Sequence, residues 1–275
     1  MNLLGAMNRE YSRSKHWSLA SLVLAAAFTV CSLVGSLGSS ERAKWVAGSA
    51  FVIQVTIVEC RRRSGAHYRL AEVVRRPAVL LAGLNRQPAE IEIRRIAARL
   101  RVSEADNRLE AQTYYASNAP PGPRRLIEII EESSFWTADL AESMANFLDG
   151  AIFVAIFLLF IASYAALETG RTASFSDAAG KILLVVATVC FAGDTTQLKS
   201  KYHELAEAAK HITDQCTVVK SKPASELLRE AMILTDEYNC ALASAPIIPE
   251  IMYSLRRDRL NSAWSAKCDL ASSKP

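Results

Sequence analysis

The chain has 275 residues, of which 51% are hydrophobic and 22% are charged, and its formal net charge is +4. A chain this rich in both kinds of residue must keep them in separate segments, which is typical of a membrane protein with charged extramembrane parts. It contains no phosphate-binding glycine loop, nucleophile elbow or paired zinc-ligand histidines, so we expect no enzyme, no cofactor and no metal. The six cysteines have no C-x-x-C spacing and imply neither a disulfide framework nor a zinc site.

Two apolar helices are predicted first, over residues 17–38 and 45–60. Crossing a bilayer takes about 20 predominantly apolar residues in a helix. We therefore predict a transmembrane hairpin over residues 17–60, preceded by a cytoplasmic N-terminus over residues 1–16. The polar Gln54 within the second segment leaves open that this segment is an interfacial or core helix.

The first apolar helix carries a stripe of small and hydroxylated side chains at spacings of three and four residues. Its members are Ser21, Ala25, Thr29, Ser32 and Ser36. Such a stripe lets helices approach closely and form hydrogen bonds in lipid. It would also line a polar lumen in an oligomer, and Gln54 and Thr56 of the second helix are further candidates for a water-facing surface. The stripe can therefore be interpreted either as a helix-packing surface or as the lining of a lumen.

Residues 61–145 are predicted to form a helical, arginine-rich cytoplasmic loop. Residues 61–101 hold eleven arginines, no lysine and three glutamates, whereas residues 102–145 hold three arginines and eight acids. The basic part would rest on anionic lipid headgroups or bind a phosphate-containing ligand, because guanidinium groups contact phosphate in bidentate fashion. The candidate ligand-binding residues, including two arginines of the C-terminal region, are Arg94, Arg95, Arg124, Arg125, Trp136, Arg256 and Arg257.

Prolines divide this loop into helices. A break is expected at residues 85–88, and a second one at residues 119–123, where Pro123 suits the first turn of the next helix. Ser133 or Ser134 is expected to cap a further helix that runs from Phe135 into the third apolar segment.

The third and fourth apolar segments, residues 147–167 and 181–193, predict a second transmembrane hairpin over residues 146–193. The third segment has no ionisable group between Asp149 and Glu168. The fourth is short, which leaves open that it is an interfacial or core helix.

Residues 194–275 are predicted to be a cytoplasmic helical region. An amphipathic helix continues from the fourth apolar segment, breaks at residues 220–223 and is followed by a second helix that packs back on it as a hairpin. Pro246 and Pro249 then lead into a last helix. The predicted fold class is an all-α membrane protein with four transmembrane helices as two hairpins, a helical cytoplasmic loop and a C-terminal helical hairpin.

The distribution of lysine and arginine predicts the orientation. Fourteen lie between the second and third apolar segments and eleven after the fourth, but only two lie in each short connection within a hairpin. Positive charge stays on the cytoplasmic side, so both termini and the long loop are expected in the cytoplasm.

Three segments resemble a known family. They are residues 9–13 (REYSR), residues 123–139 (PRRLIEIIEESSFWTAD) and residues 245–258 (APIIPEIMYSLRRD). They are similar to the S-4TM family, the four-transmembrane proteins associated with bacterial nucleotide second-messenger synthetases. The resemblance covers nearly the whole chain. The family usually has two adjacent tryptophans where this chain has Phe135-Trp136, and Asn-Pro where this chain has Ala245-Pro246.

The resemblance implies a pore-forming or membrane-disrupting effector of bacterial antiphage defence by abortive infection. A nucleotidyltransferase of the cGAS/DncV-like type would make a cyclic oligonucleotide, which would bind the cytoplasmic part of the effector in the bacterial inner membrane. The implied partners are membrane lipids, this ligand and further copies in a homo-oligomer, with neither DNA nor RNA expected. The alternative is a membrane-anchored scaffold or receptor subunit that recruits cytoplasmic proteins and forms no pore.

Overall fold

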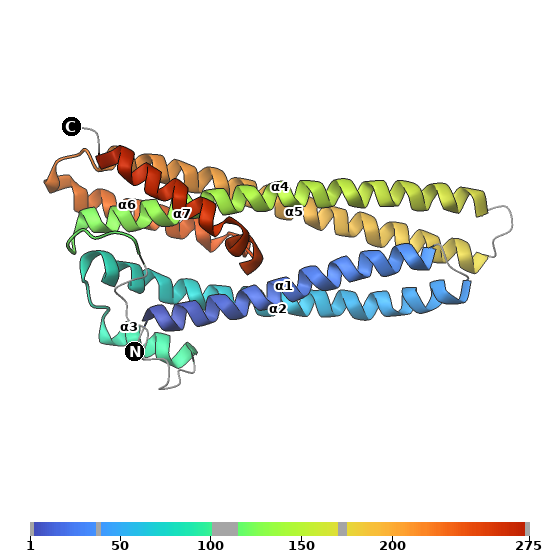
Figure 1. The fold of residues 1–275 in the computed structure, drawn as a ribbon. Coiled ribbons are helices and arrows are strands. Elements are labelled where there is room, and N and C mark those ends of the chain that lie inside the picture. Colours follow the sequence, from blue (N-terminus) through green and yellow to red (C-terminus); the bar gives the residue numbers. More distant parts are fainter. Residues whose placement is uncertain (1–2, 37–39, 101–114, 170–174, 273–275) are drawn as a thin grey trace.

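The computed structural model describes residues 3–36, 40–100, 115–169 and 175–272. Within these ranges it contains helices and no strand (Figure 1), so the all-α fold class is confirmed. The helices are α1 (Leu3–Ser36), α2 (Ser40–Leu84), α3 (Glu90–Leu100), α4 (Pro123–Thr169), α5 (Phe175–Val219), α6 (Ala224–Ala243) and α7 (Glu250–Ser272).

Four long helices of 34 to 47 residues build an elongated bundle. α1 packs along α2, and α4 packs along α5. The two pairs run side by side, and α3, α6 and α7 gather at one end of the bundle (Figure 1). At that end α6 packs on both α4 and α5.

The helix ends fall at the breaks that the prolines predict. α2 ends at Leu84, and Asn85 then adopts a φ of 55°, the left-handed conformation that commonly terminates helices. α4 begins at Pro123, α5 ends at Val219, and α7 begins directly after Pro249. The predicted helix boundaries at these proline-containing breaks are therefore confirmed.

The predicted helix cap at Ser133 or Ser134 is wrong. α4 is continuous from Pro123 to Thr169, so no helix starts at Phe135. Ser134 is buried instead, and its hydroxyl lies 2.7 Å from that of Thr213 on α5. A serine within a helix can satisfy its hydroxyl across an interface, and no helix start is then needed.

Two separate hydrophobic clusters hold the charged end of the bundle together. The larger one joins α4, α5 and α6, for example through Leu126, Ile130 and Leu234, and also includes Val79 of α2 and Leu260 of α7. The smaller one joins α1, α2 and α3 through Met7, Val74 and neighbouring residues. We call α1, α2 and α3 the α1–α3 unit and the remaining helices the α4–α7 unit; Val79 of α2 belongs to the larger cluster and links the two.

The two units touch where α2 ends and α4 begins. The backbone N–H of Gly122 donates to the carbonyl of Gly83 at 2.8 Å. A Cβ at Gly83 would lie 2.9 Å from the Cα and Cβ of Leu126, so glycine is required for this close approach.

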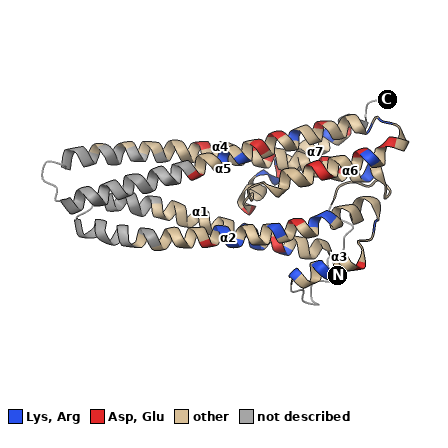
Figure 2. Cartoon of the chain, turned by 180° about the vertical axis from the view of Figure 1, so that it is seen from behind, with Lys and Arg blue, Asp and Glu red and all other residues tan. Residues whose placement is uncertain are grey.

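All four long helices change from charged to uncharged sequence at one level of the bundle, which we call the waist. There Arg61 of α2 forms a 2.7 Å ion pair with Asp194 of α5, and Lys199 of α5 forms a 2.6 Å ion pair with Asp149 of α4. α1 joins the same level, because the guanidinium of Arg63 lies 4.8 Å from the ring centre of Trp17. These contacts bring charged residues that border the apolar segments of α2, α4 and α5, and Trp17 at the start of the apolar segment of α1, to the same level. In Figure 2 the described Lys, Arg, Asp and Glu gather on the side of the waist that holds α3, α6 and α7.

Beyond the waist the helices expose large apolar side chains. On α4, the exposed fraction reaches 72% for Phe153 and 70% for Phe160. On α2, Val52, Val55 and Val58 are also exposed. Single exposed apolar residues are common, but a run of them on neighbouring helices marks a surface that contacts lipid or protein.

Among the described residues, no helix is both long enough and apolar enough to cross a membrane. Each of the four predicted transmembrane segments includes residues whose side chains lie outside the described part of the chain, and for residues 181–193 this holds throughout.

A candidate ligand site between the two units

A cavity of about 640 Å³ lies between the α1–α3 unit and the α4–α7 unit, on the charged side of the waist. Its size falls within the range of about 300–1,000 Å³ that is typical of small-molecule sites. Because both units contribute walls, a molecule bound here would contact both at once.

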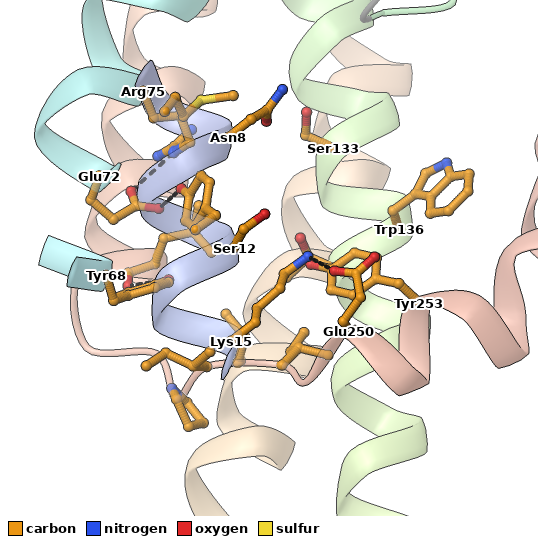
Figure 3. A pocket seen from close by; sticks show the side chains of 18 of the residues that line it. Asn8, Ser12, Lys15, Tyr68, Glu72, Arg75, Ser133, Trp136, Glu250 and Tyr253 are labelled. Atoms are coloured by element: carbon orange, nitrogen blue, oxygen red, sulfur yellow. Dashed lines mark hydrogen bonds and ion pairs between the residues drawn. The ribbon is translucent and has the colours of Figure 1, made fainter. Parts of the chain in front are cut away.

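Three helices from distant parts of the sequence each present one face to this cavity. α1 contributes residues one turn apart, which are Asn8, Tyr11, Ser12 and Lys15. α4 contributes Glu132, Ser133, Trp136 and Thr137, and α7 contributes Glu250, Tyr253 and Arg257. Figure 3 shows that the α1 residues and the start of α7 approach each other across the cavity, with α4 behind them.

The cavity is rich in aromatic side chains. They are Tyr11, Tyr68, Tyr115, Trp136, Tyr238 and Tyr253. The rings of Tyr11 and Tyr68 lie 5.9 Å apart in a tilted arrangement. Aromatic faces stack on flat heterocycles irrespective of base identity, so this lining suits a ligand with planar rings.

A buried polar network closes the inner end of the cavity. Arg75 donates to Glu72 at 2.9 Å and to the side-chain carbonyl of Asn239 on α6 at 2.5 Å. The hydroxyl of Tyr11 also donates to Glu72. Figure 3 shows Arg75 and Glu72 of this network at the cavity wall. The network therefore links α1, α2 and α6.

The protonation states in this network follow from burial and from charge pairing. Burial lowers the pKa of Arg75, but the Glu72 carboxylate together with Tyr11 and Tyr238 outweighs that effect, so the pKa lies above its usual value and the guanidinium stays charged. Burial and the Glu72 charge both raise the pKa of Tyr11, and burial does the same for Tyr68. Both phenols therefore remain neutral hydrogen-bond donors at neutral pH.

The outer end of the cavity holds a second set of charges. The ammonium of Lys15 lies 2.5 Å from a carboxylate oxygen of Glu250 and 3.9 Å from the ring centre of Tyr253 (Figure 3). Arg257, on the same face of α7, is exposed and makes no ion pair or hydrogen bond within the described part of the chain. The outer end of the cavity thus offers one paired and one unpaired cation.

Glu132 is the remaining acid of the lining. Burial raises its pKa, and a 3.0 Å hydrogen bond from the Ala116 backbone N–H opposes that effect only in part. Its charged form is therefore less favoured than that of an exposed glutamate. Because Glu72 and Glu250 are already paired with cations, the acids of the lining do not dominate the cavity electrostatically.

Two of the predicted ligand-binding residues, Trp136 and Arg257, line the cavity. Arg256 points away from the lining and contacts Ser143 at 2.5 Å and Asp139 at 3.3 Å. This contact fastens α7 to α4.

The other predicted arginines lie outside the cavity. Arg94 is exposed on α3 and pairs with Glu90 one turn earlier, and Arg95 is also exposed. Arg124 pairs with Glu128, and Arg125 donates to the Ala119 carbonyl. The structure does not bring these four arginines together with the two residues that line the cavity.

The predicted small-residue stripe is described in part. Ser21 and Ala25 are buried, and the Ser21 hydroxyl bonds within its own helix to the carbonyl of Ser18. The side chains of Thr29, Ser32 and Ser36 lie outside the described part of the chain. Gln54 and Thr56 are exposed on α2, where the Thr56 hydroxyl bonds to the Val52 carbonyl.

Lys15, Tyr253 and Arg75 are site residues that the sequence did not single out. In the sequence Lys15 is simply a charged residue before an apolar helix. Its partner Glu250 is 235 positions away, so the pair is not visible from local sequence. The sequence does contain one indication of the site: the three segments that carry the family resemblance, residues 9–13, 123–139 and 245–258, all contribute to the cavity wall.

Comparison with protein-family models, with curated proteins and with solved structures finds no match for this chain.

Proposed function

We propose that this protein is an integral membrane effector that binds a cyclic oligonucleotide in the cavity between its two units and then permeabilises the bacterial inner membrane. The four long helices enter the bilayer at the waist as two hairpins. The charged end, with both termini, lies in the cytoplasm. The S-4TM family, to which three segments of the chain are similar, supplies the context of antiphage defence and of a partner nucleotidyltransferase.

The observation that carries this proposal is the waist. Four helices lose their charges at one level, and the cross-helix contacts of Arg61 with Asp194 and of Lys199 with Asp149 fix that level. A tryptophan and several cations at such a boundary are typical of a membrane interface. The exposed Phe153 and Phe160 beyond it suit lipid as the surrounding solvent.

The positions of Arg94 and Arg95 argue against contact of this part of the loop with lipid headgroups. Arg61 and Arg63 lie at the waist, within reach of headgroups. α2 continues from there for 21 residues to Leu84, or about 30 Å at the rise of an α-helix. Arg94 and Arg95 lie on α3 beyond that point, at the end of the bundle opposite the apolar segments (Figure 1). They are too far from the proposed membrane surface to rest on its headgroups.

The lining of the cavity supports a ligand with both planar rings and negative charge. Six aromatic side chains offer stacking surfaces, while Lys15 and Arg257 offer cationic hydrogen-bond donors at the outer end. A cyclic oligonucleotide combines bases with phosphodiesters and satisfies both features.

The cavity is also placed where a ligand can act on the membrane segments. Its walls belong to α1, α2 and α4, which continue through the waist as single helices. A ligand that binds more tightly to one arrangement of the two units shifts the population toward that arrangement. A four-helix bundle encloses too little space for a wet lumen, so the conducting state requires several copies around an axis.

The test uses purified full-length protein in dye-loaded liposomes. We expect leakage only after addition of one member of a panel comprising cyclic di-AMP, cyclic di-GMP, cyclic GMP–AMP and cyclic tri-AMP. Replacing Tyr253 by leucine should abolish the response because it removes a stacking face. The control is Tyr164→Leu, which alters an exposed tyrosine of α4 beyond the waist.

Liposomes that stay sealed although the protein binds one member of the panel would refute the membrane-permeabilising function. They would favour the membrane-anchored scaffold, in which the spans only anchor and the cytoplasmic helices recruit protein partners. Failure of every member of the panel to bind would refute the ligand class.

A further inference from the structure

We propose that the Glu250 carboxylate is a built-in competitor of the ligand: it holds Lys15 in the empty cavity, and an anionic group of the ligand replaces it and frees the start of α7 from α1. This inference deepens the proposed function and rests on the cavity as its ligand site. It assigns a regulatory role to one ion pair between the two units.

The geometry places Glu250 where a ligand anion would bind. Its carboxylate oxygen lies 2.5 Å from the Lys15 ammonium, which also lies over the Tyr253 ring. All three residues line the cavity. Lys15 therefore already has an anion and an aromatic face around it, the same partners that a phosphodiester next to a base would provide.

The two residues of the pair differ in exposure. The side chain of Lys15 is 19% exposed, whereas that of Glu250 is 58% exposed. Glu250 can return to water with little loss, because an ion pair with one partner at the surface contributes little net stability. The Lys15 ammonium has less contact with water than the Glu250 carboxylate, so it is stabilised more by an anion that replaces Glu250.

The position of Arg257 favours a ligand anion over the Glu250 carboxylate as the partner of Lys15. Arg257 lies two turns after Glu250 on the face of α7 that lines the cavity, and no acid within the described residues pairs with it. A phosphate between Lys15 and Arg257 would contact two cations, whereas Glu250 contacts one of them. The bidentate geometry of the guanidinium adds to this preference.

Release of Glu250 would loosen only the first turns of α7. Further along, Arg256 contacts Ser143 and Asp139, and Lys267 pairs with buried Glu131 at 2.9 Å. The rings of Phe135 and Trp264 also pack at 5.4 Å. The C-terminal half of α7 thus stays on α4 while its start moves.

The first experiment measures amide hydrogen exchange of residues 250–257 in full-length protein without ligand. Glu250→Gln should increase exchange in this segment, and Lys15→Met should do the same, while Lys15→Arg should retain protection. The matched control is Glu226→Gln, which removes the corresponding first-turn acid of α6, an exposed residue that does not line the cavity. Unchanged exchange in residues 126–145 verifies that each variant is folded. Unchanged exchange of residues 250–257 in Glu250→Gln would overturn the proposal.

The second experiment measures binding of inorganic pyrophosphate and of the same cyclic nucleotide panel. Glu250→Gln should bind the anionic probe about two- to fivefold more tightly than the wild type, because the competitor is gone. Lys15→Met should bind at least about tenfold more weakly. Weaker or equal binding by Glu250→Gln would refute the competition. If no cyclic nucleotide binds, the proposed ligand class fails, whereas hydrogen exchange and pyrophosphate still decide the role of Glu250.

Discussion

Replacing Arg75 by methionine tests the buried network that ties α1, α2 and α6 together. The change removes the 2.9 Å contact with Glu72 and the 2.5 Å contact with Asn239, and both acceptors stay buried. Breaking a buried ion pair from one side costs about 3–5 kcal/mol, because the remaining charge is left without its partner. Tyr11 still donates to Glu72 and reduces this loss. We expect the free energy of unfolding to fall by about 3 kcal/mol.

The assay is denaturant-induced unfolding of the full-length protein in detergent, followed by circular dichroism. Arg76→Met is the control, because Arg76 is the next residue on the same helix and is exposed; it should change the free energy by less than about 0.5 kcal/mol. Adding Glu72→Gln to Arg75→Met should restore at least about 1 kcal/mol, since it removes the unpaired charge. Equal effects of the Arg75 and Arg76 variants, or strict additivity of the Arg75 and Glu72 changes, would show that the network does not stabilise the fold as argued.

Three further predictions concern packing, pH and the apolar segments. Gly83→Ala should lower the free energy of unfolding by about 1–3 kcal/mol, because the new Cβ meets Leu126; an unchanged midpoint of denaturation would contradict the close approach. Burial raises the pKa of Glu131, but hydrogen bonds from Lys220 and Lys267 outweigh it and leave the pKa below its ordinary value of 4.5. The stability that Glu131 contributes is therefore complete above pH 4.5 and is lost as pH falls through the lower folded pKa, and a Glu131→Gln variant should lack that part of the acid sensitivity. Phe153→Asp should reduce membrane insertion in a translocon assay by about 2.5–3.5 kcal/mol, and wild-type insertion would argue against lipid contact.

The helix boundaries of the charged end could be predicted because local chemistry sets them. Proline cannot donate a backbone hydrogen bond and has a fixed φ, so Pro123 and Pro249 mark helix starts wherever the rest of the chain lies. The Ser133 and Ser134 cap failed for the opposite reason. Serine suits a cap but also tolerates a helix interior when a tertiary partner such as Thr213 satisfies its hydroxyl.

The ligand site could be predicted only in part. Trp136 and Arg257 can be predicted because they lie in two of the segments that carry the family resemblance, residues 123–139 and 245–258. Lys15 cannot, since its role depends on Glu250 at the far end of the chain. Arg94 illustrates the opposite case, a predicted ligand-binding residue that does not line the cavity. Glu90 lies four residues earlier, and such pairs commonly form along one helix face and occupy the guanidinium locally. Cavity walls built from helices that are far apart in the sequence are a property of tertiary packing, which periodicity along one helix does not reveal.

The central claim is that the helices beyond the waist lie in lipid while the charged end lies in water. Site-directed spin labels at Phe153 and Phe160, in full-length protein reconstituted into liposomes, test it most directly. The account predicts that these labels collide with dissolved oxygen and are shielded from a water-soluble nickel chelate, whereas labels at the exposed Glu142 and Lys201 show the reverse. Nickel accessibility at Phe153 and Phe160 equal to that at Glu142 and Lys201 would contradict the account.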